Sequence, residues 1–250
     1  MNKENEEYSR DLFKSLEKYD SEFTEIIYNF SQVEVEKVCK LSDKDKFLCI
    51  LSVLIGCQSL SMFANVLDVA LKKNVDVIAI KEMLYQATAY LGIGRTYDYL
   101  IKANEIMSKN DIALPLGSQA TTNETNRFEK GLDKQVALFG KQMLDNQTTA
   151  PKIRKNINRW LASNCFGDYY TRTGLNDKER EMITFCFILA QGGCENQLRG
   201  HTAGNFNVGN GKEKLYQIIE QCVPYIGYPR SLNAMNIVDE LCKDLHNSSK

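Results

Sequence analysis

The stretch QGGCENQLRGHTAGNFNVGNGKEKLYQIIEQCVPYIGYPRSLNAMNIVDE, residues 191–240, decides the fold and holds the candidate chemistry. A helix that begins near Gly193 places four of its side chains at i, i+3, i+4 and i+7, along one stripe. These four residues are Cys194, Gln197, Leu198 and His201. The stripe mixes apolar with reactive side chains, so we expect any chemistry of the protein to lie there.

The segments on either side of this stretch also have helical spacing. Two of them are KFLCILSVLIGC at residues 46–57 and PKIRKNINRWLASNCF at residues 151–166, which holds the single tryptophan, Trp160. The chain has only four prolines, and it lacks alternating β-branched runs bounded by hairpin turns. The sequence therefore predicts an all-α fold, in which Trp160 anchors the packing of its helix.

One segment interrupts the helical pattern. Residues 109–126 read KNDIALPLGSQATTNETN and are rich in Asn, Thr, Ser and Gly, with little apolar periodicity. This composition is typical of a linker or of a long crossing over the surface. We therefore divide the chain into an N-terminal helical repeat at residues 1–108, a linker at 109–126 and a C-terminal helical repeat at 127–250.

The two halves contain matching residues. LSDK at residues 41–44 matches LNDK at residues 175–178, an offset of 134. Five identities follow at an offset of 135: Gln86, Tyr90, Gly92, Arg95 and Glu105 match Gln221, Tyr225, Gly227, Arg230 and Glu240. A helical match over about 65 residues predicts two tandem copies of one unit, packed face to face about a pseudo-twofold axis.

The reactive positions are those at which the copies differ. Cys194, Gln197, His201 and Glu181 of the second copy align with Ser59, Met62, Val66 and Phe47 of the first. Because Met and Val rarely recur on a solvated face, this face is expected to point into a core or a pocket wall. A partly buried imidazole at His201 needs a hydrogen-bond partner, and Glu181 and Gln197 are the candidates. The pattern predicts an acid–base site in the second copy only.

Composition limits the classes of partner. The chain has 31 basic and 32 acidic residues, a net charge of −1, and no run of Lys or Arg interleaved with aromatic residues. We therefore expect no nucleic-acid partner. The polar, acidic N-terminus lacks the apolar core of a signal peptide, and no apolar run reaches the length of a membrane span. These features predict a cytoplasmic protein without membrane contact.

Cysteine and histidine usage argues against disulfides and metal. The eight cysteines have no CxxC spacing, and we expect them to be reduced. Only two histidines exist, and His246 lies in a polar C-terminal tail, so a histidine-based metal site lacks ligands. No cofactor is expected.

The second copy resembles a known family. LNDKEREMITFCFILAQGGCENQLRGHTAGNFNVGNGKEKLYQIIEQCVPYIGYPRSLNA, together with FGDYYTRTGL before it, is similar to the carboxymuconolactone decarboxylase family, whose superfamily includes the alkylhydroperoxidase D proteins. The resemblance is good over residues 166–242 and weaker over residues 41–107. It implies an all-helical tandem member that assembles into homo-oligomeric rings, trimers or hexamers of single units, with active sites near subunit contacts.

The redox branch of this superfamily uses a CxxCxxxH motif and a helper glutamate one helix earlier. On this sequence Cys194 falls on the first cysteine of the motif, Gln197 on the second and His201 on the histidine, and Glu181 lies one residue beyond the helper position. A two-cysteine peroxidase cycle needs a resolving thiol, which Cys165, Cys186 or Cys222 would have to supply.

In the decarboxylase branch, the resemblance implies that His201 is the acid–base group acting on a lactone acid. Gln197 stands where a glutamate is often found. Our leading hypothesis is thus a carboxymuconolactone decarboxylase-like enzyme that acts on a small organic acid or lactone, with His201 as acid–base group, Cys194 lining or assisting, and Glu181 and Gln197 orienting. The alternatives are peroxidase or thiol–disulfide activity through Cys194 and a non-catalytic helical oligomer.

Overall fold

The computed structural model describes the backbone of residues 10–248 and the side chains of residues 10–243. These residues form helices joined by turns and loops, without a strand. The all-α prediction is confirmed. None of the described helices is long and apolar enough to span a lipid bilayer. The helices before the linker are α2 (Lys14–Glu17), α3 (Ser21–Tyr28), η1 (Asn29–Glu34), α4 (Val35–Val38), α5 (Asp43–Gly56), α6 (Leu60–Lys72), α7 (Val77–Leu91) and α8 (Ile93–Lys109).

The helices after the linker follow the same plan. They are α9 (Arg127–Phe139), α10 (Gln142–Thr148), η2 (Lys152–Arg154), α11 (Lys155–Trp160), η3 (Leu161–Tyr170), α12 (Asp177–Gln191), α13 (Glu195–Asn207), α14 (Lys212–Ile226) and α15 (Tyr228–Ser248). The connections within α5–α8 and α12–α15 have equal lengths: residues 57–59 and 192–194, residues 73–76 and 208–211, then one glycine each. These bounds agree with the internal repeat.

The helices that correspond to each other also start in the same way. The Ser42 side chain accepts a hydrogen bond from the backbone N–H of Asp45 at the start of α5. At the start of α12, Asn176 and Glu179 form a complete capping box. Both caps satisfy backbone donors that the first helical turn leaves unpaired. The LSDK and LNDK segments thus begin the central helix of each copy.

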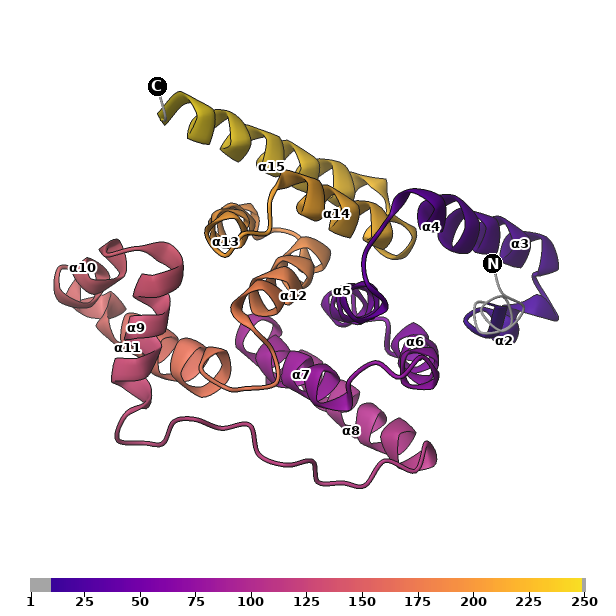
Figure 1. Cartoon of the computed structure of the whole chain (residues 1–250), viewed down its shortest axis with the longest axis horizontal. Helices are drawn as coiled ribbons and strands as arrows, with labels where there is room; N and C mark the ends of the chain where they lie inside the picture. Colours follow the sequence, from indigo (N-terminus) through magenta and orange to yellow (C-terminus); the bar gives the residue numbers. More distant parts are fainter. Residues whose placement is uncertain (1–9, 249–250) are drawn as a thin grey trace.

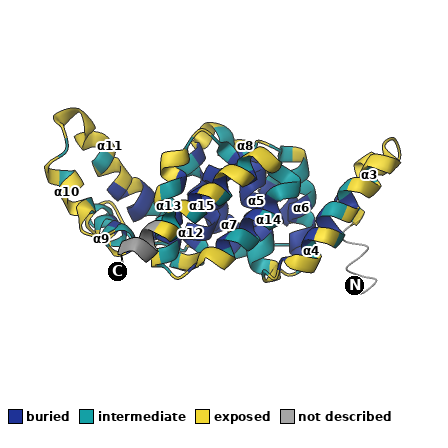
Figure 2. Cartoon of the chain, turned by 90° about the horizontal axis from the view of Figure 1, so that it is seen from above, coloured by how far each residue is buried: buried dark blue, intermediate teal, exposed yellow. Residues whose placement is uncertain are grey.

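Both copies contribute to one hydrophobic core. Helices α5 and α12 pack on each other at the centre of the molecule (Figure 1), and they are covered by their neighbours, so that their residues are mostly buried (Figure 2). The packing is reciprocal, since α7 of the first copy contacts α12 and α14 of the second copy contacts α5. Such an exchange is expected of two copies related by a pseudo-twofold axis. The boundaries of the predicted domains stay a prediction, because the larger hydrophobic core is shared by both copies.

A buried polar network also joins the copies. The Arg180 side chain on α12 is fully buried, and it donates to Gln86 Oε1 at 2.7 Å and to Glu82 Oε2 at 3.3 Å, both on α7. Arg172 Nε donates to the same Glu82 carboxylate at 2.9 Å. A buried charge is tolerated when it is paired and hydrogen-bonded in this way, so the network fixes α7 against α12.

The segment between the copies is irregular from Asn110 to Asn126 and runs along one side of the molecule to α9 (Figure 1). Helix α9 crosses η3 closely at Gly131 and Gly167, where an added Cβ would overlap the facing backbone. This crossing holds the C-terminal end of α9 beside α13. The predicted anchoring role of Trp160 is wrong, because this side chain is 57% exposed on α11.

Candidate active site

The centre of the site is a pair of side chains on adjacent helices. His201 Nδ1 on α13 lies 2.9 Å from Glu181 Oε2 on α12. The Glu181 side chain is fully buried, whereas 13% of the His201 side chain is exposed. The sequence left Glu181 and Gln197 as alternative partners of the imidazole, and the structure selects Glu181. The imidazole is largely enclosed yet still reaches the surface.

Two neighbours on α13 make room for this pair and hold it. A Cβ at Gly204 would overlap both the Glu181 carboxylate and the ring of Phe139, so the approach of the two helices requires a glycine. Asn205 Nδ2 donates to the backbone oxygen of Glu181 at 3.0 Å and to that of His201 at 2.8 Å. Helices α12 and α13 are therefore fixed to each other at the level of the pair.

The second carboxylate oxygen is also paired. The Tyr170 hydroxyl donates to Glu181 Oε1 at 2.9 Å. Because Tyr170 has one proton to give, the hydroxyls of Thr184 at 2.8 Å and Tyr90 at 2.9 Å donate to its oxygen. Burial raises the pKa of Tyr90 and of Tyr170 well above the usual value for a phenol, so both remain neutral donors. This chain of hydroxyls ends on the carboxylate.

One member of the chain comes from the first copy. Tyr90 lies on α7, and its ring meets the His201 ring edge to face at a centroid distance of 5.3 Å. The Phe139 ring, from the end of α9, packs in the same manner at 5.4 Å. The site therefore includes a side chain from the copy that lacks a histidine. The sequence contained one indication that Tyr90 matters, namely that the matching position of the second copy, Tyr225, is also a tyrosine. Two identical residues at matching positions are equally expected if both only pack in the core.

This geometry determines which ring nitrogen of His201 is available for proton transfer. Glu181 accepts one hydrogen bond from Tyr170 at Oε1, and its Oε2 faces Nδ1. A proton on Nδ1 completes this hydrogen bond and leaves the lone pair on Nε2. A proton can then be accepted or donated at Nε2, while the carboxylate keeps the ring in one orientation.

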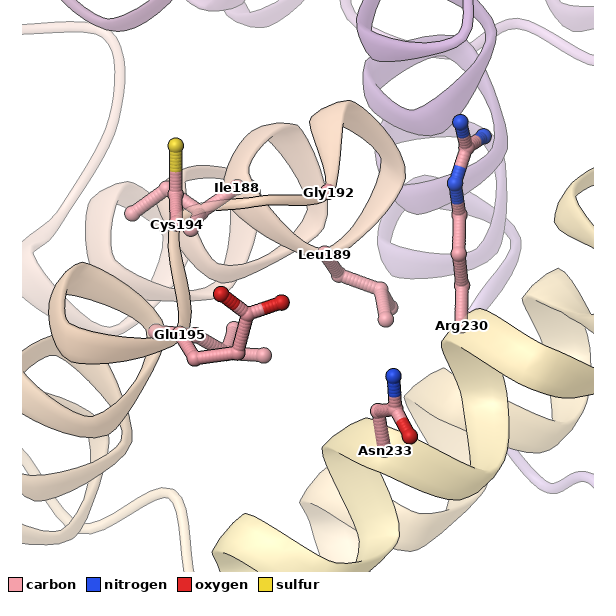
Figure 3. Close-up of a pocket in the computed structure, with 8 residues that line it drawn as sticks. Ile188, Leu189, Gly192, Cys194, Glu195, Arg230 and Asn233 are labelled. Carbon is pink, nitrogen blue, oxygen red and sulfur yellow. The ribbon is translucent and has the colours of Figure 1, made fainter.

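Cys194 lies apart from this cluster. It is the N-cap residue of α13, which begins at Glu195. Gln191 Nε2 lies 2.9 Å from its sulfur, and Arg95 Nη1 donates to Gln191 Oε1 at 3.1 Å. Cys194 lines a cavity of about 30 Å³, in which it and Glu195 lie across from Arg230 and Asn233 of α15 (Figure 3). His201 does not line this cavity.

The remaining candidates are not brought to the imidazole. Gln197 is exposed on α13. Among the described residues, no cysteine forms a disulfide. Of the three candidate resolving thiols, Cys165 contacts the Tyr90 hydroxyl at 3.7 Å, and Cys186 contacts Cys49 and Cys222 in the core. The resolution of an oxidised Cys194 by one of these three thiols therefore stays a prediction.

Within residues 10–243, no group of three or more His, Cys, Asp or Glu side chains could hold a metal ion.

The first copy has a different cavity in the corresponding place. It measures about 160 Å³ and is lined by Phe13, Ile27, Leu54, Ser59, Met62, Pro224 and Tyr225. Ser59 and Met62 are the counterparts of Cys194 and Gln197, and Tyr225 is the counterpart of Tyr90. No acid–base pair lines this cavity, and the counterparts of His201 and Glu181 in the first copy are Val66 and Phe47.

Comparison with known proteins finds a family that part of the second copy resembles. Residues 156–240 match the model of the carboxymuconolactone decarboxylase family. A 4-carboxymuconolactone decarboxylase from Acinetobacter baylyi (strain ATCC 33305 / BD413 / ADP1) is 28% identical to this chain over 124 residues. The aligned region is 49% of this chain and 92% of that relative. The relative thus corresponds to about half of this chain, and the matched family region contains both His201 and Glu181.

Proposed function

We propose that the chain is a member of the carboxymuconolactone decarboxylase family and a decarboxylase-like enzyme acting on a small organic acid or lactone, because residues 156–240 match the model of that family. The observation that carries the proposal is the 2.9 Å contact between His201 Nδ1 and Glu181 Oε2. It pairs a mostly enclosed imidazole with a buried carboxylate, which is an arrangement suited to acid–base catalysis.

In the proposed reaction, His201 transfers the proton. Loss of a carboxylate as CO₂ breaks a carbon–carbon bond and leaves the electron pair on the substrate carbon. A protonated Nε2 of His201 donates its proton to that carbon, and the solvent returns a proton to Nε2 for the next turnover. A positioned acid or base of this kind contributes about 10²- to 10⁴-fold in rate.

The other members of the cluster hold His201 in place. Glu181 fixes the ring through Nδ1, and Tyr170 and Tyr90 hold the carboxylate through the hydroxyl chain. Phe139 covers the ring. Tyr90, Tyr170 and Phe139 are therefore proposed as positioning residues. Gln197 and Cys194 are proposed to take no part in proton transfer, since they lie outside the hydrogen-bonded cluster.

The test measures CO₂ release from a panel of small lactone and keto acids by the whole chain. His201→Asn and Glu181→Gln preserve the size of each side chain and remove its acid–base property. We expect a drop in kcat of about 10²- to 10⁴-fold for His201→Asn and a smaller drop for Glu181→Gln. Gln197→Ala, on the exposed side of the same helix, is the matched control and should retain activity.

Two results would contradict the proposal. If the His201→Asn variant released CO₂ at the full rate, the imidazole would have no role in the reaction. Absence of turnover across the panel, with unchanged binding of all compounds in both variants, would favour the non-catalytic helical oligomer. Mass spectrometry after peroxide treatment addresses the thiol alternative separately, because it predicts oxidation of Cys194 to a sulfenic acid or a disulfide.

A further inference from the structure

A chain of hydrogen bonds continues from Thr184 away from the candidate site and into the first copy. Gln86 on α7 lies beside Thr184, and its Nε2 donates to the Thr184 hydroxyl at 2.8 Å. The same nitrogen donates to the backbone oxygen of Arg180 at 3.0 Å, and the Gln86 oxygen accepts from Arg180 Nη1 at 2.7 Å. Both amide protons and the amide oxygen of this fully buried side chain are therefore engaged.

Arg180 determines the direction of the bonds in this chain. A guanidinium has donors only, so the Gln86 atom that faces it must be the amide oxygen. One amide proton then points at Thr184, whose oxygen accepts it and whose single proton is left for Tyr170. The Tyr170 proton goes in turn to Glu181 Oε1. All bonds from the guanidinium to the carboxylate therefore run in one direction, from donor to acceptor.

This fixed direction leaves Glu181 as an acceptor only. The Tyr170 oxygen already receives protons from Thr184 and Tyr90, so it cannot accept one from Glu181 as well. A series of donors that starts at a cation also favours the negative charge of the carboxylate at its other end. Glu181 Oε2 then accepts the hydrogen bond from His201, which places the imidazole proton on Nδ1.

We propose that Gln86 of the first copy is a positioning residue for His201: it relays the donor direction of Arg180 and thereby keeps the imidazole proton on Nδ1. The role of this relay in turnover rests on the proposed function, whereas the position of the proton does not. The candidate site of the second copy thus depends on a side chain of the copy that has no histidine at the corresponding position.

The internal repeat supplies a matched control for Gln86. Its counterpart is Gln221 on α14, which is buried to almost the same extent, 2% exposed compared with 0% for Gln86. The first-copy residue at the position of Thr184 is Ile50, which has no hydroxyl. Gln86→Met and Gln221→Met therefore remove the same amide from matching helices, but only Gln86→Met interrupts the chain that ends on the carboxylate.

The test measures which ring nitrogen of His201 carries the proton. Nitrogen-15 NMR of protein labelled at histidine distinguishes Nδ1–H from Nε2–H in the neutral imidazole. The chain has only two histidines, so a His246→Gln variant identifies the signals of His201. We expect Nδ1–H to predominate in the unaltered protein. Gln86→Met and Thr184→Val should each raise the fraction of Nε2–H roughly two- to tenfold, the effect of losing one hydrogen bond.

Two further variants separate the relay from packing. Thr184→Ser keeps the hydroxyl and should retain the proton on Nδ1, whereas Thr184→Val keeps the shape of the side chain and loses the hydroxyl. Gln221→Met should leave the position of the proton unchanged. Urea unfolding checks that each variant is folded. If Gln86→Met does not fold, the two Thr184 variants decide the question, because each changes the side chain only slightly.

The same variants have an expected effect on CO₂ release. Thr184→Val should lower kcat roughly two- to tenfold and leave KM unchanged, because the relay acts on the imidazole and not on the substrate. The NMR measurement needs no substrate, so it distinguishes the two proposals. A chain without turnover would reject the proposed function and leave the relay in place, whereas an unaltered proton position in Thr184→Val would reject the relay alone.

Three results would overturn the inference. The first is an unaltered protein in which Nε2–H predominates. The second is a Thr184→Val variant with the same proton position as the unaltered protein. The third is a Thr184→Ser or Gln221→Met variant that raises the fraction of Nε2–H as much as Thr184→Val does, since packing rather than the hydroxyl chain would then control the imidazole.

Discussion

At the scale of single residues, the site depends on a buried carboxylate whose two oxygens are both engaged. Glu181 faces His201 at one oxygen and accepts from Tyr170 at the other. An unpaired carboxylate would be costly in this position, so each partner contributes to stability as well as to orientation. Gly204 provides the space in which the helices bring these groups together.

Replacing Gly204 with Ala should therefore disturb the pair. The added Cβ would overlap the Glu181 carboxylate and the Phe139 ring, and we expect a loss of about 1–3 kcal/mol in the free energy of unfolding. Gly200→Ala is the matched control, because Gly200 lies on the same helix with open space around its Cβ position. It should stabilise the protein by up to about 1 kcal/mol. Urea unfolding measures both, and equal effects at the two positions would contradict the prediction.

At the scale of elements, the start of α12 places the functional carboxylate. The capping box of Asn176 and Glu179 fixes the first turn of this helix, and Glu181 follows in the next residues. Helix α12 also contacts the other copy, through α5 and α7. The position of Glu181 thus depends on a local signal at the helix start and on packing from the other half of the chain.

Asn176→Ala should remove the cap and lower the free energy of unfolding by about 1 kcal/mol. Asn176→Asp retains an acceptor oxygen and should keep most of the free energy of unfolding that Asn176→Ala loses. The corresponding change at the start of α5, Ser42→Ala, should have an effect of similar size, because Ser42 makes the same type of cap. Thermal or urea unfolding distinguishes the variants, and an Asn176→Ala protein as stable as the parent would disprove the assigned role of the cap.

At the scale of the whole molecule, the two copies form one folding unit. Their central helices pack on each other, and the Arg180 network joins α12 to α7. We therefore predict that a fragment of residues 127–250 does not fold alone, since the apolar face of α12 would be exposed to water. Co-expression with residues 1–126 should restore a folded complex. Circular dichroism of the fragment checks this, and a cooperative unfolding transition of the isolated fragment would contradict it.

The buried thiols and phenols predict a loss of stability in alkali. Burial raises the pKa of Cys165 from 9.0 to about 12 and that of Tyr99 from 10.0 to about 12. In the unfolded chain these groups lose their protons near their ordinary pKa values, whereas the folded protein retains them. The contribution of these protonated groups to the free energy of unfolding is therefore complete below about pH 9 and is lost as the pH rises toward 12.

For each such group, the free energy of unfolding should fall by about 1.4 kcal/mol per pH unit in this range. Urea unfolding at about pH 8 and about pH 10.5 measures the slope. Cys165→Ala should make the slope shallower than in the parent protein. A free energy of unfolding that stays constant between these two pH values would contradict the prediction.

The sequence by itself determined the all-α class, the start of each central helix, the matching segments and the place of His201, because helical periodicity, caps and turns are local properties of the chain. Only the tertiary structure showed that Glu181 rather than Gln197 pairs with His201 and that Cys194 lies apart from the imidazole. It also showed that Trp160 is exposed and that Tyr90 packs against the His201 ring. Tyr90 and Tyr170 are 80 positions apart, and their hydroxyls meet only because α7 of one copy packs against helices of the other. Contacts of this kind depend on how helices pack, which no local pattern in the sequence specifies.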